Sequence, residues 1–358
     1  MNRALGIVPI LAAAAGLACA SEGYSIQNLG SLGGNASYGM GLNDAGQVVG
    51  WGTTPSGERG FLWDPSTGMH VLAPSTGGVD SRGRAINSSG KVAGYSAVSN
   101  SSLQSATWAG ASANTFSPVS GASLTYTGGI NSSAEVVGWA QTTSGYKAYR
   151  WSGSSSALLG TLSGDTEATA YALNDSGMAV GASYGASGGT AVYWDASGVH
   201  KIGILAGGTY SNAYGLNSLD HMTGLSGSTI GQQAYLYSSG SMTGLGYLAG
   251  DTYSVGFGVN GSDWVVGRSG NSAGQHAFLW HDGAMVSLQS LLTATDAAHW
   301  QLFDAQGINA AGQIVGTGYY DGQLRAYILG PQAVPEPSSF LALVGGGLWM
   351  RKRKKANT

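Results

Sequence analysis

A nine-residue stretch from Leu42 to Gly50, LNDAGQVVG, returns in varied form along almost the whole chain. Each copy is anchored by an asparagine, and successive anchors are 44, 44, 43, 43, 43 and 49 residues apart. The seven anchors are Asn43, Asn87, Asn131, Asn174, Asn217, Asn260 and Asn309. A repeat of this length is one supersecondary unit that buries its apolar face by packing on its neighbours. The sequence therefore predicts one body of seven equivalent units.

The first unit indicates how each repeat folds. Four short extended segments, 38–42, 47–52, 60–63 and 70–72, are separated by turn sequences rich in Gly, Asp, Ser and Pro. The whole chain has 61 glycines and only 9% charged residues, which favours short strands and tight turns over helices. Four-stranded meanders repeated at about 40 to 45 residues are typical of β-propellers. We expect an all-β, seven-bladed propeller over residues 21–330.

The first strand of each unit has a small residue, Gly, Ala or Thr, at the second and fourth positions before the asparagine, such as Gly41 and Gly39. Because alternate residues share one face of a strand, this strand is predicted to be innermost, where blades crowd together. The seventh unit lacks a fourth strand of its own, and residues 24–30 resemble the missing one. We expect this N-terminal strand to complete the last blade and close the ring.

Most repeated side chains are interpreted as structural. Asn-x-x-Gly between two strands has the spacing of an Asx-stabilised turn with a left-handed glycine. The aromatic residue that ends the third strand, Trp63 in the first unit, is expected to pack between blades. A polar donor stands four residues before it in each unit, and we expect these donors to hydrogen-bond the adjoining loop. They are Arg59, Gln104, Lys147, Thr190, Gln233, His276 and Arg325.

Two groups of residues are candidates for ligand binding. Trp51, Tyr95 and Trp139 follow the Val-Val-Gly sequence or its equivalent in the first three units only, so they form a candidate aromatic patch; packing is the alternative interpretation. The 49-residue interval contains an insertion, residues 291–300, with Asp296, His299 and Trp300. Loops that break a repeat often carry function, although a harmless surface insertion is the alternative.

The N-terminus has the form of an export signal over residues 1–20. Arg3 precedes an apolar run, and Ala18 and Ala20 frame a small-residue cleavage site. A lipoprotein signal acylated at Cys19 is the alternative. Since Cys19 is the only cysteine, the mature protein would have none, which excludes disulfides and cysteine catalysis.

The C-terminal region, residues 331–358, contains Val334, Pro335, Glu336 and Pro337, then an apolar run, then the basic residues 351–355. This tail resembles the PEP-CTERM sorting signal of exported proteins of Gram-negative bacteria. The resemblance implies processing by an exosortase and an address at the outer surface or in the extracellular matrix. The apolar run of residues 340–350 is shorter than the roughly 20 residues of a spanning helix, so we expect only transient contact with the inner membrane.

The repeat itself resembles a known family. The pattern Gly-x-Asn-x-x-Gly-x-Val-Val-Gly is followed by an Ala-aromatic step, spelled His276-Ala277-Phe278 in the sixth unit, and then by Leu-Gly-x-Leu-x-Gly-Gly. This is similar to the HAF-type extracellular repeats and covers roughly residues 24–330. The resemblance implies an exported repeat protein without an established reaction.

Apart from Arg3 and the five C-terminal cations, the chain has 9 Lys and Arg against 18 Asp and Glu, so nucleic-acid binding is not expected. The six histidines show no metal-ligand spacing, and we predict no cofactor, metal or catalytic residue. The leading hypothesis is a monomeric, non-enzymatic surface propeller for adhesion or for interaction with extracellular polysaccharide or protein. The alternative is a glycoside hydrolase or polysaccharide lyase, which needs paired carboxylates in the central cavity, where the inner strands offer mainly Asp304.

Overall fold

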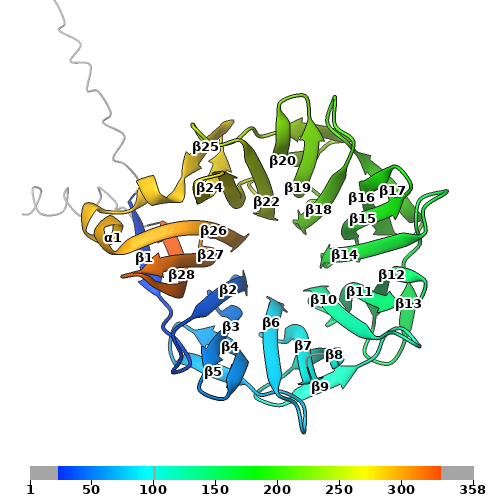
Figure 1. Cartoon of the computed structure of the whole chain (residues 1–358), viewed down its shortest axis with the longest axis horizontal. Coiled ribbons are helices and arrows are strands. Elements are labelled where there is room, and N and C mark those ends of the chain that lie inside the picture. The colour runs from blue at the N-terminus through cyan, green and yellow to red at the C-terminus, as the bar shows by residue number, and fades with distance from the viewer. Residues whose placement is uncertain (1–22, 100–101, 332–358) are drawn as a thin grey trace, which may run out of the picture. The chain divides into compact units, whose positions relative to one another are not determined.

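The computed structural model describes residues 23–99 and 102–331. Residues Tyr24–Pro331 form one compact unit of seven antiparallel sheets, each of four strands, arranged as blades around a central channel (Figure 1). The predicted seven-bladed propeller is therefore confirmed. The predicted cleavage residues Ala18 and Ala20 and the sorting box Val334–Pro337 lie outside the described residues. Within the described part, no helix has the length and apolar character needed to cross a bilayer.

Each blade is a meander whose first strand borders the channel and whose fourth lies at the rim (Figure 1). Blade 1 contains β2 (Ser37–Leu42), β3 (Val48–Thr54), β4 (Gly57–Asp64) and β5 (Gly68–Leu72). Blade 2 contains β6 (Asp80–Ile86), β7 (Val92–Ser99), β8 (Ser102–Trp108) and β9 (Ala113–Phe116). Blade 3 contains β10 (Leu124–Ile130), β11 (Val136–Thr142), β12 (Gly145–Trp151) and β13 (Ser156–Leu158).

The remaining blades continue this order. Blade 4 contains β14 (Glu167–Leu173), β15 (Ala179–Gly185), β16 (Gly188–Asp195) and β17 (Gly198–Gly203). Blade 5 contains β18 (Ser211–Leu216), β19 (Met222–Ser228), β20 (Gly231–Ser238) and β21 (Ser241–Gly244). Blade 6 contains β22 (Tyr253–Val259), β23 (Val265–Asn271), β24 (Gly274–His281) and β25 (Ala284–Ser287). The insertion after blade 6 forms a 3-10 turn, η1 (Leu288–Leu291), and a short helix, α1 (Ala294–His299).

Blade 7 is assembled from both ends of the described chain. Its inner strands are β26 (Trp300–Ile308), β27 (Ile314–Tyr320) and β28 (Gln323–Pro331), and its outer strand is β1 (Tyr24–Asn28). The pairing runs from Tyr24 opposite Pro331 to Asn28 opposite Tyr327. The predicted closure by the N-terminal strand is confirmed, and it pairs an edge of β28 that would otherwise be open.

The core lies between blades. The aromatic residue of the Ala-aromatic step is fully buried in five blades, as Phe61, Tyr149, Tyr235, Phe278 and Tyr327. The aromatic residue that ends the third strand is also buried in four blades, as Trp63, Trp108, Trp151 and Trp194. In one inter-blade cluster Phe61 and Trp63 of blade 1 pack with Val315 and Ala326 of blade 7. The predicted packing role of these aromatic residues is confirmed.

Every inner strand has a β-bulge at the same place, which the spacing of small residues did not predict. The register shifts between the fourth and second residues before the asparagine, for example between Gly39 and Gly41. These two residues therefore face opposite sides: a Cβ on Gly39 would lie 2.7 Å from Val315 Cγ2 of blade 7, and one on Gly41 would lie 3.1 Å from the Arg84 carbonyl oxygen of blade 2. The expectation that they share one face was wrong, because the bulge adds a residue between them. Small residues are needed on both sides of the strand.

Candidate functional site

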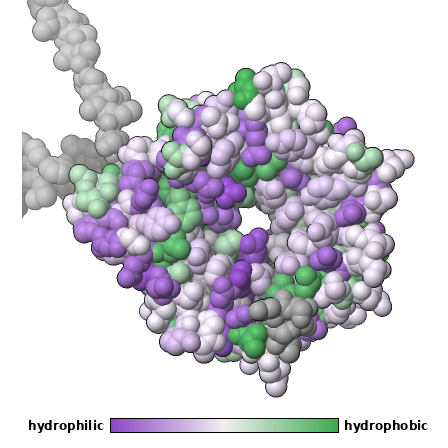
Figure 2. Space-filling view, viewed as in Figure 1, coloured by the Kyte–Doolittle hydropathy of each residue, from purple (hydrophilic) through white to green (hydrophobic). Residues whose placement is uncertain are grey.

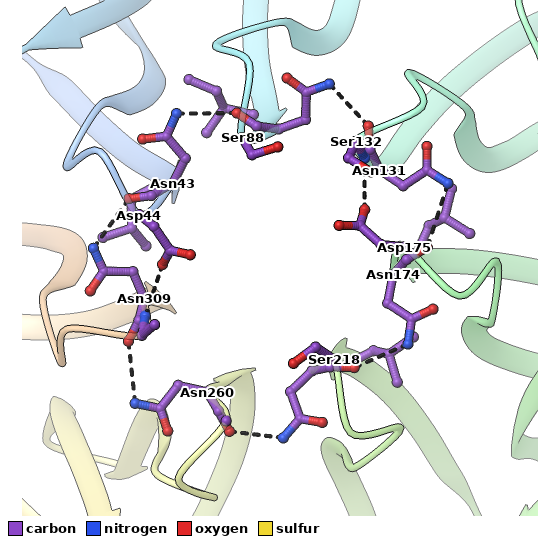
Figure 3. Close-up of a pocket in the computed structure, with 18 of the residues that line it drawn as sticks. Asn43, Asp44, Ser88, Asn131, Ser132, Asn174, Asp175, Ser218, Asn260 and Asn309 are labelled. Carbon is purple, nitrogen blue, oxygen red and sulfur yellow. Dashed lines mark hydrogen bonds between the residues drawn. The ribbon is translucent and has the colours of Figure 1, made fainter.

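The repeated asparagine lines one mouth of the channel, shown in Figure 3, and makes two kinds of hydrogen bond there. Its Oδ1 accepts the backbone N–H four residues later, as Asn43 does from Gln47 at 3.0 Å, which is the predicted Asx turn. The residue three positions after it has positive φ in all seven turns and is glycine in four of them. The structural interpretation of Asn-x-x-Gly is confirmed.

The same asparagines also join the blades. Each Nδ2 donates to the backbone carbonyl of the next asparagine in the ring at 2.8 to 3.5 Å, and the series closes from Asn309 to Asn43 (Figure 3). This mouth encloses about 310 Å³ and contains two carboxylates, Asp44 and Asp175. Each of them accepts a backbone N–H of the preceding blade, from Ala310 at 3.0 Å and from Ser132 at 2.7 Å. The asparagines and both carboxylates of the mouth thus hold the ring together.

The extra residue of each bulge lines the channel one level deeper. These seven residues are Met40, Arg84, Gly128, Tyr171, Tyr214, Phe257 and Gln306. The residues next to them in the strand are small in every blade, but the residue type at this position changes from blade to blade. Only blades 4 and 5 have the same residue type, tyrosine. A bulge re-aims one side chain without disturbing the rest of a ladder, so this layer can vary while the fold stays constant.

The predicted aromatic patch lies on neighbouring blades, next to the inner strands. Trp51 stacks on Tyr38 with ring centroids 4.0 Å apart, and Trp139 stacks on Tyr126 in the same way at 4.0 Å. Tyr95 lies between them and meets Tyr126 edge to face at 6.1 Å. The three residues therefore belong to one row of π contacts, which the structure shows to be packed against other aromatic residues.

The members of this row differ in what covers them. The Arg82 guanidinium lies 4.0 Å from the Trp51 ring centroid and 5.7 Å from that of Tyr95, while its Nε donates to Glu58 Oε2 at 2.7 Å. Trp139, in contrast, lines a cavity of about 370 Å³ between blades 3 and 4. We call this the aromatic cavity; it is lined by Trp139, Tyr146, Glu167, Thr169, Tyr171 and Tyr184.

Glycines make room for the walls of the aromatic cavity. A Cβ on Gly145 would lie 2.5 Å from Cδ of Glu167, and one on Gly189 would lie 2.7 Å from the Tyr184 ring. Glu167 Oε2 accepts the backbone N–H of Tyr146 at 3.1 Å. The Tyr184 hydroxyl donates to Asn212 Oδ1 at 3.0 Å, and burial raises its pKa. The cavity thus has fixed aromatic walls, one carboxylate and hydroxyl groups.

The three candidate residues of the inserted segment lie in three different environments. Trp300 is only 5% exposed and packs with Tyr320 and Tyr327 at centroid distances of 5.0 and 5.9 Å. His299 is exposed, and its Nδ1 lies 2.8 Å from Asp321 Oδ1 in the β27–β28 turn. Asp296 accepts the Thr293 hydroxyl at 2.8 Å while its own N–H donates to that oxygen at 3.1 Å, which caps α1.

His299 and Trp300 line one shallow hollow of about 460 Å³ with Asp321, and Asp296 is not among its lining residues. The insertion lies beside the turn between the second and third strands of blade 7, where the Asp321 amide also donates to the His299 carbonyl at 3.0 Å. Ligand binding by Asp296, His299 and Trp300 stays a prediction.

Three of the seven predicted donors, near the start of the third strand, reach the loop that leads into the next blade, whereas Gln233 donates to Ser228 in its own blade. Arg59 Nη1 donates to the Val79 carbonyl at 2.5 Å, Lys147 Nζ to that of Thr166 at 2.7 Å, and Arg325 Nη1 to that of Asn35 at 2.8 Å. Each acceptor lies in the loop that leads into the next blade, so these side chains hold neighbouring blades together. Among residues 23–99 and 102–331, no three His, Cys, Asp or Glu side chains are grouped to hold a metal ion.

Comparisons with known proteins show the fold alone. No family model matches the chain, and no curated protein matches it in sequence. Among solved structures, it is similar to YCF48 from Cyanidioschyzon merolae with 10% identity and a TM-score of 0.51, over 84% of this chain and 98% of that one. TolB from Acinetobacter baumannii shares 11% identity at a TM-score of 0.44, over 87% of this chain and 65% of TolB. The SapL1 lectin, solved with alpha methyl fucoside, shares 12% identity at a TM-score of 0.38, over 73% of this chain and 98% of the lectin.

Tyr146, Glu167, Tyr171 and Tyr184 were not among the residues expected to bind ligand. The sequence does contain one signal for Tyr171, because a large residue stands between two obligatory small ones in the first strand. The other three come from different strands and from two blades, so only the packed ring brings them to Trp139.

Proposed function

We propose that this protein is an exported, non-enzymatic carbohydrate-binding propeller that acts at the outer surface or in the extracellular matrix of a Gram-negative bacterium. The observation that carries the proposal is the aromatic cavity, in which Trp139 and three tyrosines surround Glu167 and Thr169. Apolar walls with a few fixed polar groups are the usual construction of a small-molecule site, and about 370 Å³ lies within the usual size range.

The chemistry of the walls fits a sugar ring. One face of a pyranose presents C–H groups, which pack against the electron-rich face of an indole or phenol ring. The hydroxyl groups at the edge of the sugar need acceptors and donors, which Glu167 and the tyrosine hydroxyls supply. Glu167 already uses Oε2 for the Tyr146 amide, so its position is fixed before a ligand arrives.

The proposed address rests on the two ends of the chain. An export signal with cleavage after Ala20, and a tail that resembles PEP-CTERM signals, support transport across the inner membrane and processing by an exosortase. A sparsely charged, monomeric ring with an acidic body would then meet polysaccharide outside the cell. The propeller would bind the polysaccharide, and the tail would retain the protein at the cell or release it after processing.

Binding can be tested by probing a glycan array with residues 21–333, which contain every strand of the ring. We expect binding of defined glycans that Trp139→Ala reduces by at least about tenfold, since about 1.4 kcal/mol of stacking is tenfold in affinity. Trp51→Ala is the matched control, because Trp51 occupies the equivalent strand position but is covered by Tyr38 and Arg82. Absence of binding, or equal loss in both variants, would refute the carbohydrate proposal.

The different-class alternative is a hydrolase or lyase that acts on the same polysaccharide. Glycoside hydrolysis by the usual route needs two carboxyl groups about 5 to 10 Å apart. Glu167 is the one carboxylate among the residues that line the aromatic cavity, and the two at the channel mouth hold backbone amides. Binding without turnover is therefore the function that the geometry favours.

A further inference from the structure

The central channel contains a cationic group that the carbohydrate proposal does not use. Figure 2 shows the open hole at the centre of the ring, with hydrophilic side chains on parts of its border. At the level of the bulges the channel encloses about 230 Å³, and Arg84 is the charged residue in its lining. The other large side chains there are Met40, Tyr171, Tyr214, Phe257 and Gln306.

Arg84 has no oxygen acceptor among the residues that the structure describes. Within residues 23–99 and 102–331, its one hydrogen-bond partner is the Met40 thioether, with Nη1 and Sδ 4.0 Å apart. A guanidinium has five N–H donors, and a thioether sulfur is a weak acceptor. By comparison, Arg82 donates to Glu58, Arg150 to the Gly177 carbonyl and Arg325 to the Asn35 carbonyl.

The surroundings leave the positive charge of Arg84 without a counter-charge. The titratable groups that act on it are Tyr95, Arg82 and Tyr171, and the Arg82 charge opposes its own. Burial lowers the pKa of Arg84, although an arginine stays protonated in proteins. Asp304, a second ionisable group near the channel, accepts the Thr317 amide at 2.9 Å and Gln306 Nε2 at 3.0 Å. Arg84 is half-buried in the channel, so its charge is only partly solvated, and a bound anion would supply the acidic partner that its neighbours do not.

The rest of the lining indicates what kind of anion fits. Tyr171 and Tyr214 meet edge to face at 5.0 Å, and Phe257 lies 5.8 Å from Tyr214, so three rings form a continuous apolar wall at the level of Arg84. The volume of about 230 Å³ at this level is below the roughly 300 Å³ at which most ligand pockets begin, which favours a small ligand. A planar carboxylate can accept two parallel N–H bonds from one guanidinium.

We propose that the channel at the level of Arg84 is a binding site for a small organic carboxylate. The carboxylate pairs with the Arg84 guanidinium, and the apolar body of the ligand lies against Tyr171, Tyr214 and Phe257. This axial site is separate from the aromatic cavity, although Tyr171 lines both, and it goes beyond the proposed carbohydrate function.

Benzoate and its uncharged isostere benzamide are suitable probes. Isothermal titration of residues 21–333 is expected to detect benzoate binding, with benzamide weaker by at least about tenfold, or about 1.4 kcal/mol. Arg84→Gln is expected to reduce benzoate affinity by a similar factor, and Arg84→Lys by less. Arg59→Gln, which removes the same charge from a side chain bonded to the Val79 carbonyl, is the matched control and should bind like wild type.

Three further measurements make the test decisive. Thermal unfolding should show that benzoate raises Tm of the wild-type protein, as a ligand specific to the native state does. Trp139→Ala should keep the wild-type benzoate affinity, since Trp139 lines only the aromatic cavity of the two sites. Inorganic phosphate should bind more weakly than benzoate, because it cannot use the aromatic wall.

The proposal is overturned if wild-type protein binds no benzoate, if benzamide or phosphate binds equally well, or if Arg84→Gln folds and binds like wild type. Loss of benzoate binding in Trp139→Ala would place the ligand in the aromatic cavity and also overturn it. Failure of the glycan array would leave these outcomes unchanged, because benzoate binding depends on Arg84 and not on Trp139.

Discussion

The side chain of Asn87 shows how one residue type can both shape a turn and hold a ring together. Its Oδ1 accepts the Lys91 amide at 2.9 Å, inside its own blade, while its Nδ2 donates to the Asn131 carbonyl of the next blade at 3.0 Å. The residue is 4% exposed, so water cannot replace these partners. The same pair of bonds in seven blades explains why the asparagine recurs, and why Gln, Ser or Asp does not take its place.

Replacing Asn87 by alanine is expected to lower the free energy of unfolding by about 1 to 3 kcal/mol, because a buried amide and carbonyl lose their partners. Urea unfolding followed by circular dichroism measures this. Ser88→Ala is the control, since Ser88 is exposed at the same mouth and should change stability by less than about 0.5 kcal/mol. An Asn87→Ala protein as stable as the control would show that the inter-blade ring contributes nothing.

At the scale of the element, the bulge in each inner strand explains the glycine that ends the Val-Val-Gly motif. A Cβ at this position would lie 1.9 to 2.1 Å from a carbonyl oxygen of the first strand in all seven blades, that of the residue just before the glycine's pairing partner. The seven glycines are Gly50, Gly94, Gly138, Gly181, Gly224, Gly267 and Gly316. The bulge that aims Arg84 or Tyr171 into the channel therefore depends on a glycine in the neighbouring strand.

Gly94→Ala tests this dependence. Its Cβ would lie 2.0 Å from the Arg82 carbonyl oxygen, so the two strands must separate, and we expect destabilisation of about 1 to 3 kcal/mol or more. The matched control is Gly261→Ala, because a Cβ at Gly261 meets nothing within 4 Å. Thermal melts of the two variants compare them directly. Equal melting temperatures would mean that the inner strands tolerate a side chain at the bulge.

The whole molecule is a closed ring, and its stability depends on how the closure is made. Blades contact only their neighbours, so an open ring would expose two inter-blade faces like the one that buries Phe61 and Trp63. The strand β1 prevents this by pairing with β28 over Tyr24 to Asn28. The two ends of the described chain therefore meet in one sheet, which couples the first blade to the last.

Deletion of residues 21–30 is expected to lower the melting temperature and to expose the edge of β28. The control is a circular permutant in which a linker joins residues 331 and 23 and the chain is opened in the β16–β17 turn, so that blade 4 is assembled from both ends. This permutant should melt close to the wild type, because the same kind of closure has moved to another blade. An unchanged melting temperature for the deletion variant would rule out β1 as the closure.

The sequence alone determined the blade count, the four-strand unit, the Asx turns, the packing of the repeated aromatic residues and the closure by the N-terminal strand. These features are local or repeated, so periodicity and turn chemistry are enough to reveal them. The bulges were not foreseen, because the register between two strands is set by pairing and not by the spacing of small residues. The second bond of each asparagine also depends on the next blade, which lies 43 to 49 residues away in six cases and 266 residues away where Asn309 meets Asn43.

The residues of the candidate sites could likewise be predicted only in part from the sequence. Trp139 could be selected from its position after Val-Val-Gly, but its partners Tyr146, Glu167 and Tyr184 come from three other strands of two blades. Trp300 is of a residue type that often binds ligands, yet the structure buries it in the core between blades 6 and 7. Arg84 shares the one sequence signal of Tyr171, a large residue between two small ones, but that pattern does not show that it lacks an acidic partner. The sequence shows which positions vary between the repeats. Only the closed ring decides which of these residues face a cavity, because the exposure of a side chain depends on how the blades pack.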